Sequence, residues 1–390
     1  MNASQSFRIS LPTRILFGVG SINDLPRSVG DLLGAKILLV LDPGLAAANL
    51  VEKITAPLTA AGLAFVPFDR VDPEPSLRLA DEAAALAVGE GCDVVVGAGG
   101  GSAMDVAKAA AMLATNGGAA EDYLGLGKVK RPGLPTIMVP TTAGTGAEVT
   151  FTAVFINEKT QSKGGINSDF LYPNTAILDP SLTVSLPKTV TAYTGIDAFT
   201  HALEAFVSVQ ANAVSDLYAL EAITLISRCL GPACANGRNL EARSSMLLGS
   251  LLGGQALATA GVGLVHAMAY PMGGMHRIPH GLANAVLLPY VMDYNLVAVP
   301  DRFRTVAWAM EAAPPQISAR EGAEAAVQAV RRLNRDIGIP STLAALGIPA
   351  EDIPKMADIA LTVTRPVENN PRRPTRDEVI AVYQQALAGV

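Results

Sequence analysis

The sequence predicts two domains: an α/β domain with a doubly wound parallel sheet over residues 1–185, and an all-α domain over residues 186–390. Three observations lead to this division. The length of 390 residues suits about two domains. In the first half, short aliphatic runs alternate with helical patterns, as they do in α/β proteins. After Leu186 and Pro187 the sequence changes to long Ala- and Leu-rich segments with few strand signals.

Buried parallel strands are expected in the aliphatic runs of the first half, because each run is followed by a helical or turn pattern. In chain order these runs are KILLVLD (36–42), AFVPFD (64–69), CDVVVGAGGG (92–101), PTIMVPTT (135–142) and NTAILDP (174–180). Helices are expected in the periodic segments of the second half, which include residues 192–207, 215–230 and 321–338.

Composition and charge narrow the classes of function. Hydrophobic residues make up 50% of the chain and charged residues 16%, so large buried cores are expected and disorder is not. The formal net charge is −6 and no cluster of Lys or Arg stands out. We therefore expect neither nucleic acid nor an anionic membrane as a partner.

One segment is long enough to span a bilayer, because no charged residue lies between Arg243 and Arg277. It also contains Gln255, two histidines and many glycines, so we expect a buried helix followed by a loop. The three cysteines show no metal or disulfide spacing, and the N-terminus carries no apolar signal segment. These observations favour a cytoplasmic protein.

A glycine cluster between a predicted strand and a predicted helix favours phosphate binding. In VVVGAGGGSAMDVAK (94–108), residues Gly99, Gly100 and Gly101 lack a Cβ atom, so backbone N–H groups can approach a pyrophosphate at the helix N-terminus. The GxGxxG fingerprint fails, because position 102 is Ser. The alternative is a tight turn in which Ser102 caps the helix and Asp105 completes a capping box. Both can hold together.

The acidic residue that suits a ribose stands in an unusual place. In the usual dinucleotide fold, an acid about 20 residues after the glycines binds the adenosine ribose. Here the best acid at a strand end is Asp42, which precedes the glycines. If Asp42 binds the ribose, the strand order differs from that of a standard Rossmann domain. The alternative is that Asp42 only forms the turn before Pro43 and Gly44.

A threonine-rich turn follows the strand that contains Ile137. In PTTAGTGAEVT (140–150), the hydroxyl groups of Thr141, Thr142 and Thr145 lie where they suit phosphate or ribose contacts. The alternative is that they serve only the turn and its caps.

A metal site is predicted from an acid and three of the four histidines. Asp197 and His201 are four residues apart in a predicted helix, so their side chains share one face. A lone histidine there would be a core residue, but a buried carboxylate beside it favours a divalent ion. The charge-free segment adds His266, late in its predicted helix, and His280, in a loop between Pro279 and Gly281. One oxygen and three nitrogens suit Fe²⁺ or Zn²⁺ better than Mg²⁺ or Ca²⁺.

These motifs carry a family resemblance. GIDAFTHALEAF, GLVHAMAYPMGGMHRIPHG, GGGSAMDVAK and PTTAGTGAEVT occur in this order, followed by NNPRRPT near the C-terminus. Over nearly the whole chain the sequence resembles the iron-containing (group III) alcohol dehydrogenases. The resemblance implies a nucleotide-binding N-terminal domain, a helical C-terminal domain, and a catalytic metal in the cleft between them. It also implies NAD(P)-dependent interconversion of alcohols with aldehydes or ketones.

Carried over residue by residue, the resemblance implies the following site. The metal ligands are Asp197, His201, His266 and His280. The cofactor contacts are Asp42, Gly99, Gly100, Gly101, Ser102, Thr141, Thr142, Thr145, Lys163 and the turn from Thr183 to Leu186. The carboxylate at position 42 resembles the NAD-preferring members, since it would repel the 2′-phosphate of NADP.

The chain departs from the family at Tyr270, where many members have a second histidine four residues after the third ligand. That position lies close to nicotinamide and substrate in the family, so Tyr270 and the ligand His280 are expected at the catalytic centre. Tyr270 either relays a proton or only packs. Leu257, where some branches carry an aromatic residue, suggests a roomier or differently shaped substrate pocket.

The expected activity is hydride transfer between NAD(H) and a small alcohol or carbonyl substrate. The metal would lower the pKa of the alcohol and the nicotinamide would accept the hydride. Iron and zinc both remain open, and a homodimer or higher homo-oligomer is expected. The alternative is a non-redox enzyme of the same fold, similar to dehydroquinate synthases. It would need many cations for an anionic substrate, whereas the motif segments contain Lys108, Lys163 and Arg277. A structural metal-binding module is a weaker alternative, because such sites are usually closed by thiolates.

Overall fold

The computed structural model describes residues 6–159 and 162–390. Its contacts group the described residues of 11–186 into one compact unit, and residues 6–10 with 187–390 into a second. The division lies beside the predicted boundary at residue 185. Residues 6–10 group with the helical unit.

The α/β unit is built on a six-stranded sheet in the order β1-β9-β6-β4-β2-β3, in which every neighbouring pair is parallel. The strands are β1 (Arg14–Phe17), β2 (Lys36–Leu41), β3 (Ala64–Phe68), β4 (Val94–Gly99), β6 (Thr136–Pro140) and β9 (Thr175–Leu178). The aliphatic runs predicted as strands form β2, β3, β4, β6 and β9, whereas β1 was not predicted.

The strand order confirms a doubly wound sheet that is not a standard Rossmann sheet. Without the edge strand β1, the order β3-β2-β4-β6-β9 is the flavodoxin-like order 2-1-3-4-5. The chain first adds β3 on one side of β2 and then adds β4, β6 and β9 on the other side, so the direction of strand addition changes between the paired strands β2 and β4. Ligands of such sheets bind beyond the carboxyl ends of the strands at this reversal. Asp42 and the glycine cluster follow β2 and β4 there.

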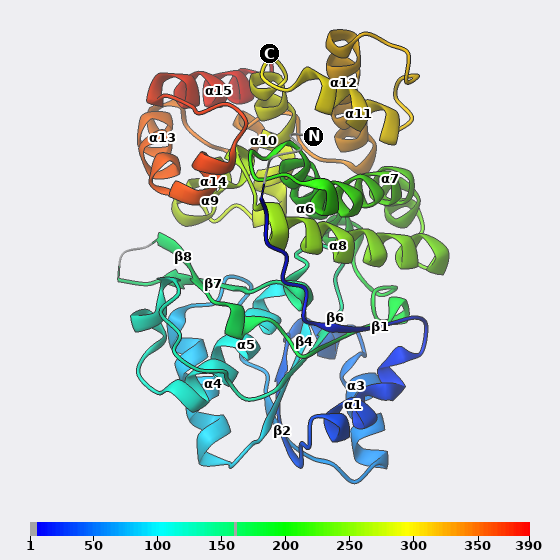
Figure 1. The fold of residues 1–390 in the computed structure, drawn as a ribbon, viewed down its shortest axis with the longest axis vertical. Coiled ribbons are helices and arrows are strands. Elements are labelled where there is room, and N and C mark those ends of the chain that lie inside the picture. Colours follow the sequence, from blue (N-terminus) through cyan, green and yellow to red (C-terminus); the bar gives the residue numbers. More distant parts are fainter. Residues whose placement is uncertain (1–5, 160–161) are drawn as a thin grey trace. The chain divides into compact units, whose positions relative to one another are not determined.

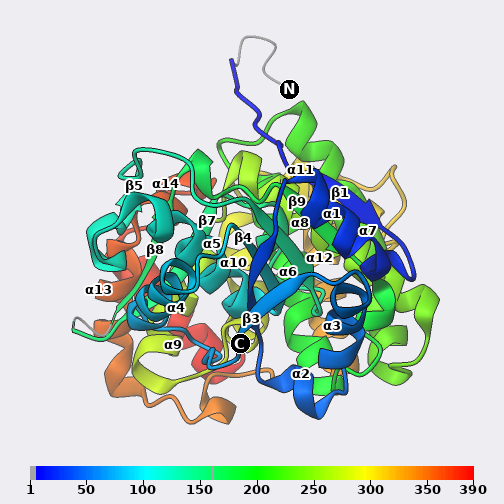
Figure 2. The same cartoon turned by 90° about the horizontal axis from the view of Figure 1, so that it is seen from below.

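Alternating residues of the strands face two separate cores. On β2, Ile37 and Leu39 contribute to the core under α1 (Leu25–Asp31) and α3 (Val51–Ala60). Leu38 and Val40 contribute to the core under α4 (Leu77–Gly89) and α5 (Gly101–Asn116). Figures 1 and 2 show these helix pairs on opposite faces of the sheet. Both faces are therefore apolar, as expected of strands with continuous aliphatic runs.

Smaller elements complete the α/β unit. A second sheet, in the order β5-β8-β7, consists of β5 (Gly125–Leu126), β7 (Thr152–Asn157) and β8 (Ser162–Asn167). The sequence analysis did not predict it. The short helix α2 (Gly44–Ala47) follows β2 directly.

The second unit is helical, as predicted. Its helices are α6 (Lys188–Val207), α7 (Ala213–Ala235), α8 (Leu240–Ala260), α9 (Leu264–His276), α10 (His280–Asn295), α11 (Pro300–Ala309), α12 (Ala319–Ile337), α13 (Ile353–Thr362), α14 (Thr364–Asn369) and α15 (Arg376–Ala388). Side chains cap several N-termini, among them Asn212 for α7, Ser318 for α12 and Thr375 for α15. The central helix α6 packs against α7, α8 and α10.

The charge-free segment is not the helix and loop that the sequence analysis predicted. It forms two helices, α8 and α9, which meet at an angle of 105°. Helix α8 ends at Gly261, which has a φ of 73°, and α9 begins after Gly263. Glycines end the first helix here, so an apolar and uncharged segment can still change direction.

Among the described residues, helix α7 is long and apolar enough to cross a membrane. The bent pair of α8 and α9 is also long and apolar enough when it is taken as one segment. A core helix can be equally long and apolar. On α7, Ala219, Ile223, Ile226 and Leu230 recur at helical spacing and are fully buried. This stripe is what packing in a protein core requires.

Candidate functional site

The structure brings together the four residues predicted as metal ligands. Asp197 and His201 lie on α6, one turn apart. His266 is the third residue of α9, and His280 is the first residue of α10. The predictions of His266 late in a helix and of His280 in a loop were therefore wrong. The helix break places His266 in a first turn, and Pro279 serves as the N-cap of α10.

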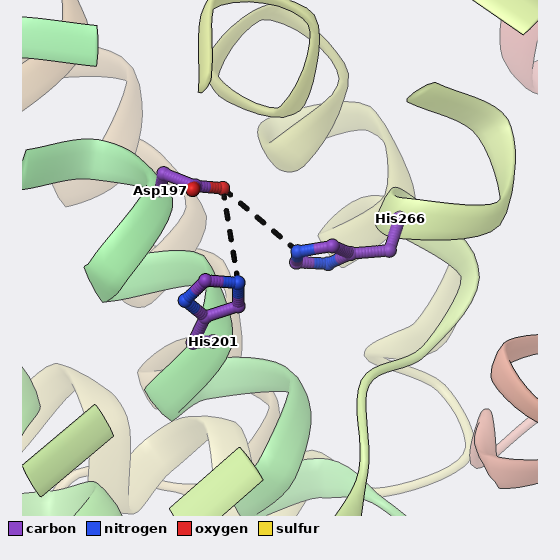
Figure 3. Close-up of side chains that lie close together, drawn as sticks. All are labelled: Asp197, His201 and His266. Carbon is purple, nitrogen blue, oxygen red and sulfur yellow. Dashed lines mark ion pairs between the residues drawn. The ribbon is translucent and has the colours of Figure 1, made fainter. Parts of the chain in front are cut away.

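The carboxylate of Asp197 lies at the centre of the three imidazoles. Its Oδ1 is 4.0 Å from Nε2 of His201, 3.8 Å from Nε2 of His266 and 3.9 Å from Nε2 of His280. Figure 3 shows the first two of these ion pairs. The rings of His201 and His266 are stacked, with centroids 4.8 Å apart. Asp197, His201 and His266 are buried, and His280 is the most accessible of the four.

This geometry fits a transition-metal ion. Ligand atoms around a tetrahedral ion with bonds of about 2.0–2.2 Å lie about 3.3–3.6 Å apart. The distances from Asp197 Oδ1 to the three Nε2 atoms, 3.8 to 4.0 Å, exceed this spacing by a few tenths of an ångström. The ligand atoms of Asp197, His201 and His266 all lie within 4.8 Å of one another, so the set is wider than that around a bound ion and would contract on binding. A buried donor set of one carboxylate and three imidazoles suits Fe²⁺ or Zn²⁺. Asp197, His201, His266 and His280 could thus hold one divalent ion.

A close approach of two helices places His280 beside Asp197. A Cβ atom added to Gly281 would lie 2.3 Å from the carbonyl oxygen of Tyr193 on α6. Any other residue at position 281 would push α10 away from α6. Gly281 is therefore required for His280 to reach the other ligands.

Burial and the imidazoles act in opposite directions on the acid. Burial raises the pKa of Asp197, but His201, His280, His266 and the amide of Asn284 together hold that pKa below its usual value. The carboxylate is therefore ionised at neutral pH and available to a cation.

Glu204 is a functional residue that the sequence analysis missed. It lies on α6, fully within the helical core, and its carboxylate accepts hydrogen bonds from the backbone N–H groups of Gly263 (2.8 Å) and Val265 (2.6 Å). It also lies 2.6 Å from Nδ1 of His266. Because the carboxylate can only accept, Nδ1 carries the proton and Nε2 faces Asp197 with a lone pair. Such carboxylate–histidine pairs orient metal ligands.

The carboxylate of Glu204 also shifts the titration of His266. Burial lowers the pKa of His266, but the ion pair and hydrogen bond with Glu204 outweigh burial and raise it. The signal that could have revealed Glu204 is its position seven residues after Asp197, two turns along the same helix.

Tyr270 lies next to the ligand set. Its ring centroid is 6.1 Å from that of His280, and it is one turn after His266 on α9. His276, the remaining histidine, instead has its Nε2 3.3 Å from a carboxylate oxygen of Asp352. The structure therefore brings Tyr270, but not His276, to the candidate metal centre.

In the α/β unit, Asp42 and the glycine cluster are in direct contact. A Cβ atom added to Gly99, whose φ is 148°, would lie 2.6 Å from Cβ of Asp42. Only glycine fits at position 99. The carboxylate of Asp42 accepts a hydrogen bond from the N–H group of Gly44 at 2.8 Å, as the turn-forming alternative expected. Its second oxygen lies near Gly100, so the turn does not exclude a ribose contact.

The helix that follows the glycines begins at Gly101 with Gly100 as its N-cap. No side chain within the described part of the chain caps it, so the predicted capping box of Ser102 and Asp105 is wrong. Ser102 donates to the carbonyl oxygen of Pro73, and Asp105 accepts from the N–H group of Val154. The N-terminal N–H groups of α5 are thus not occupied by a side-chain cap, as an anion site requires.

The threonine turn packs on the glycine cluster. The N–H group of Thr141 donates to the carbonyl oxygen of Gly99 at 2.9 Å. Thr142 lies against Gly100, and a Cβ atom added to Gly101 would lie 2.7 Å from the Thr145 side chain. The two motifs that the sequence analysis assigned to the cofactor therefore pack directly against each other.

Lys108 links α5 to the threonine turn and to β7. Its side chain is fully buried, its ammonium group is 2.9 Å from Asp105, and it donates to the carbonyl oxygens of Ala147 and Thr152. Lys163 is also buried, 2.5 Å from a carboxylate oxygen of Glu74. Thr183 donates to the carbonyl oxygen of Pro180 and accepts from Leu186, closing the turn after β9.

Glu148, in the threonine turn, is buried, and burial raises its pKa to about 7. An unfolded glutamate titrates near 4.3. Between these values the folded chain binds a proton that the unfolded chain has released, so the free energy of unfolding falls as pH rises. Glu148→Gln should remove this loss and make the protein about 2–3 kcal/mol more stable than wild type at pH 8. Urea unfolding measures the difference.

At pH 5 the difference should shrink to about 1 kcal/mol or less, because pH 5 is less than one unit above the pKa of the unfolded carboxyl group. A stability difference that does not change between pH 5 and pH 8 would rule out titration of Glu148 as the cause.

A doubly wound α/β unit, of the type that binds nucleotides in other proteins, and a buried set of one carboxylate and three imidazoles are together what a metal-dependent dehydrogenase requires. The sequence model of the iron-containing alcohol dehydrogenases matches residues 12–180, and the model of the C-terminal part of the Fe-containing alcohol dehydrogenase family matches residues 191–387. The chain belongs to the iron-containing alcohol dehydrogenase family.

Curated relatives and solved structures agree with this assignment. The chain is 42% identical to long-chain-alcohol dehydrogenase 1 of Geobacillus thermodenitrificans, over 98% of this chain and 97% of that protein. It is 41% identical to 1,3-propanediol dehydrogenase of Klebsiella pneumoniae, over 98% and 99% of the two chains. A crystal structure of 1,3-propanediol oxidoreductase superposes with a TM-score of 0.96 at 40% identity, covering 98% of this chain and all of that one.

The chain is therefore an oxidoreductase that interconverts alcohols with aldehydes or ketones. The dehydroquinate synthase-like alternative is not favoured, because the relatives are dehydrogenases and reductases of alcohols and aldehydes. Two of the three cations that such an enzyme would use, Lys108 and Lys163, are moreover bound to Asp105 and Glu74.

Proposed function

We propose that this chain is an NAD(H)-dependent dehydrogenase of small primary alcohols whose metal ion, Fe²⁺ in the cell, is held by Asp197, His201, His266 and His280. The observation that carries the proposal is the convergence of three imidazole nitrogens on Asp197 Oδ1 within 4.0 Å. Zn²⁺ suits the same donors, so the ion that occupies the site depends on which metal the cell supplies.

The bound ion supplies Lewis-acid chemistry, which acidifies an alcohol and polarises a carbonyl group. The residues of the chain do the rest. Glu204 keeps the Nε2 lone pair of His266 directed at the centre. The glycine cluster, Thr141, Thr142 and Thr145 hold the phosphates, while Asp42 binds the adenosine ribose. Tyr270, beside His280, passes a proton between substrate and solvent.

The substrate class follows from the relatives. Their names include long-chain alcohols and 1,3-propanediol, and the latter carries primary hydroxyl groups. We extend this class to the present chain, with the aldehyde as the reverse substrate. The proposed assembly is a homodimer or higher homo-oligomer, and the proposed location is the cytoplasm.

The test is to measure turnover and metal content on the same preparation. The full-length protein, loaded anaerobically with Fe²⁺ or with Zn²⁺, is assayed for NAD reduction with a series of primary alcohols and diols. We expect activity that scales with about one ion per chain. A protein that binds one ion but reduces no NAD with any of these alcohols would contradict the proposed substrate class.

Cofactor preference should depend on Asp42. The wild-type enzyme should favour NAD, because the carboxylate accepts ribose hydrogen bonds and would repel a 2′-phosphate. Asp42→Gly should lower the ratio of kcat/KM for NAD to that for NADP by about 10- to 100-fold.

Asp42→Asn is the matched control, since it removes the charge but keeps an acceptor for the N–H group of Gly44. It should shift the ratio in the same direction with less loss of stability. Equal kcat/KM for the two cofactors in the wild-type enzyme would contradict the role of Asp42.

Tyr270→Phe should keep the metal and lower kcat by about 10- to 100-fold, the loss expected when acid–base help is removed. The pH profile of the wild-type enzyme should show no change in activity near pH 6.5 that arises from position 270, because a phenol titrates near 10. Steady-state kinetics between pH 5 and pH 10 provide the measurement.

The control is Tyr290→Phe, which removes a buried hydroxyl that donates to the carbonyl oxygen of Ser341. It should cost stability and leave kcat unchanged. If Tyr270→Phe also leaves kcat and the pH profile unchanged, Tyr270 is only a packing residue.

A further inference from the structure

Asn284 lies inside the ligand set, although no motif pointed to it. It is fully buried on α10, one turn after His280. Its Nδ2 lies 2.6 Å from Oδ1 of Asp197 and 3.2 Å from Nε2 of both His266 and His280. These are three of the four atoms that converge at the candidate metal centre. The amide nitrogen therefore contacts the same lone pairs that a metal ion would use.

The amide has fewer hydrogens than it has acceptors. A carboxamide carries two N–H bonds, and here three acceptors surround it. The charged oxygen of Asp197 takes the short bond, and the second hydrogen is shared between the two imidazoles. His266 can accept it, because Glu204 holds the proton of that ring on Nδ1. The N–H groups thus lie between lone pairs that would otherwise repel one another.

The carbonyl oxygen of the same amide accepts no hydrogen bond from the described residues. Oδ1 of Asn284 is buried and has no hydrogen-bond partner among the described residues. Buried amides are normally anchored through both groups, because an unsatisfied oxygen is costly. Asn284 is therefore anchored mainly by the metal-ligand side chains, and no hydrogen bond at the oxygen opposes a rotation of the amide.

We propose that Asn284 is a positioning residue of the metal centre, which assembles Asp197, His266 and His280 before metal binding and exchanges its hydrogen bonds when the ion binds. A ring nitrogen cannot give one lone pair to both an N–H group and an ion. The two imidazole contacts are therefore released on binding, and the hydrogen bond to Asp197 remains. The inference rests on the metal centre proposed above.

The test uses the full-length chain, stripped by a chelator and titrated with Zn²⁺. The Kd is measured by competition with a chromophoric chelator, and Tm is measured with and without the ion. Asn284→Ala should weaken Zn²⁺ binding by about 10- to 100-fold and reduce the rise in Tm on zinc addition. Asn284→Asp should lower Tm of the metal-free protein below that of Asn284→Ala, because two carboxylates then meet. Zinc should raise its Tm by more than in wild type.

Asn295→Ala is the matched control, since Asn295 is buried on the same helix and its amide is paired with Asn370 by bonds of 2.8 Å. It should lower Tm equally with and without zinc and leave Kd within about twofold. A purely structural Asn284 would behave in the same way, and this result would overturn the inference. If the wild-type chain itself bound no zinc, the result would contradict the proposed metal centre, and with it the role of Asn284.

Discussion

Replacing His266 by alanine is expected to abolish stable metal binding and to lower kcat/KM by at least about a thousandfold, or about 4 kcal/mol of transition-state stabilisation. His266 supplies Nε2 to the centre and is the ligand that Glu204 orients. Its loss leaves Asp197 buried with one imidazole fewer beside it. Metal content by mass spectrometry and kcat/KM for a primary alcohol are the measurements. His280→Ala should behave similarly.

His276→Ala is the control for this prediction. His276 lies in the same helix as His266 but has its Nε2 beside Asp352, so metal content and kcat/KM should stay close to wild type. Full occupancy in His266→Ala and His280→Ala would contradict the proposed ligand set.

Glu204→Leu should lower the free energy of unfolding of the metal-free protein by about 3–5 kcal/mol. The substitution leaves Gly263, Val265 and His266 with buried donors and no acceptor, each at a cost of about 1–3 kcal/mol. Glu204→Gln keeps the shape but brings an NH₂ group among donors, so a loss of about 2–4 kcal/mol is expected. Both variants should also bind Zn²⁺ about 10- to 100-fold more weakly.

Glu221→Gln, at an exposed position on α7, provides the comparison and should change the unfolding free energy by less than about 0.5 kcal/mol. Denaturant unfolding of the stripped protein separates the effect on the fold from that on metal affinity. If Glu204→Leu unfolds at the wild-type denaturant concentration, the three hydrogen bonds contribute no net stability.

The fold was largely predictable, because continuous aliphatic runs signal strands that are buried on both faces. The edge strand β1 and the β5-β8-β7 sheet were not predicted. Strand β1 has four residues, of which Arg14 and Phe17 are exposed, so its apolar run is too short to stand out as a buried strand. In β8, two glycines take the place of β-branched residues. Pairing with neighbours that are distant in the chain decides such segments, and local pattern does not.

The candidate ligands were predictable from residue type, but their surroundings were not. Asp and His at helical spacing on an apolar face are conspicuous. The spacing of Glu204 from Asp197 is a weak signal by itself, and the contacts of Glu204 with His266 and of Asn284 with Asp197 join residues far apart in the chain. These contacts form only when α9 and α10 pack against α6. The capping box at Ser102 failed for the same reason, since Pro73 and Val154 lie outside the local sequence and take its hydrogen bonds.

The distribution of the donors over α6, α9 and α10 has a consequence for the order of events during synthesis. When α6 has left the ribosome, the chain offers only the pair Asp197 and His201, which is a weak chelator. His266 emerges after α7 and α8 have been made, and His280 opens a helix that must still pack against α6. With the proposed ligand set, metal acquisition is therefore expected late in biogenesis, when the helical unit has already folded around Gly281.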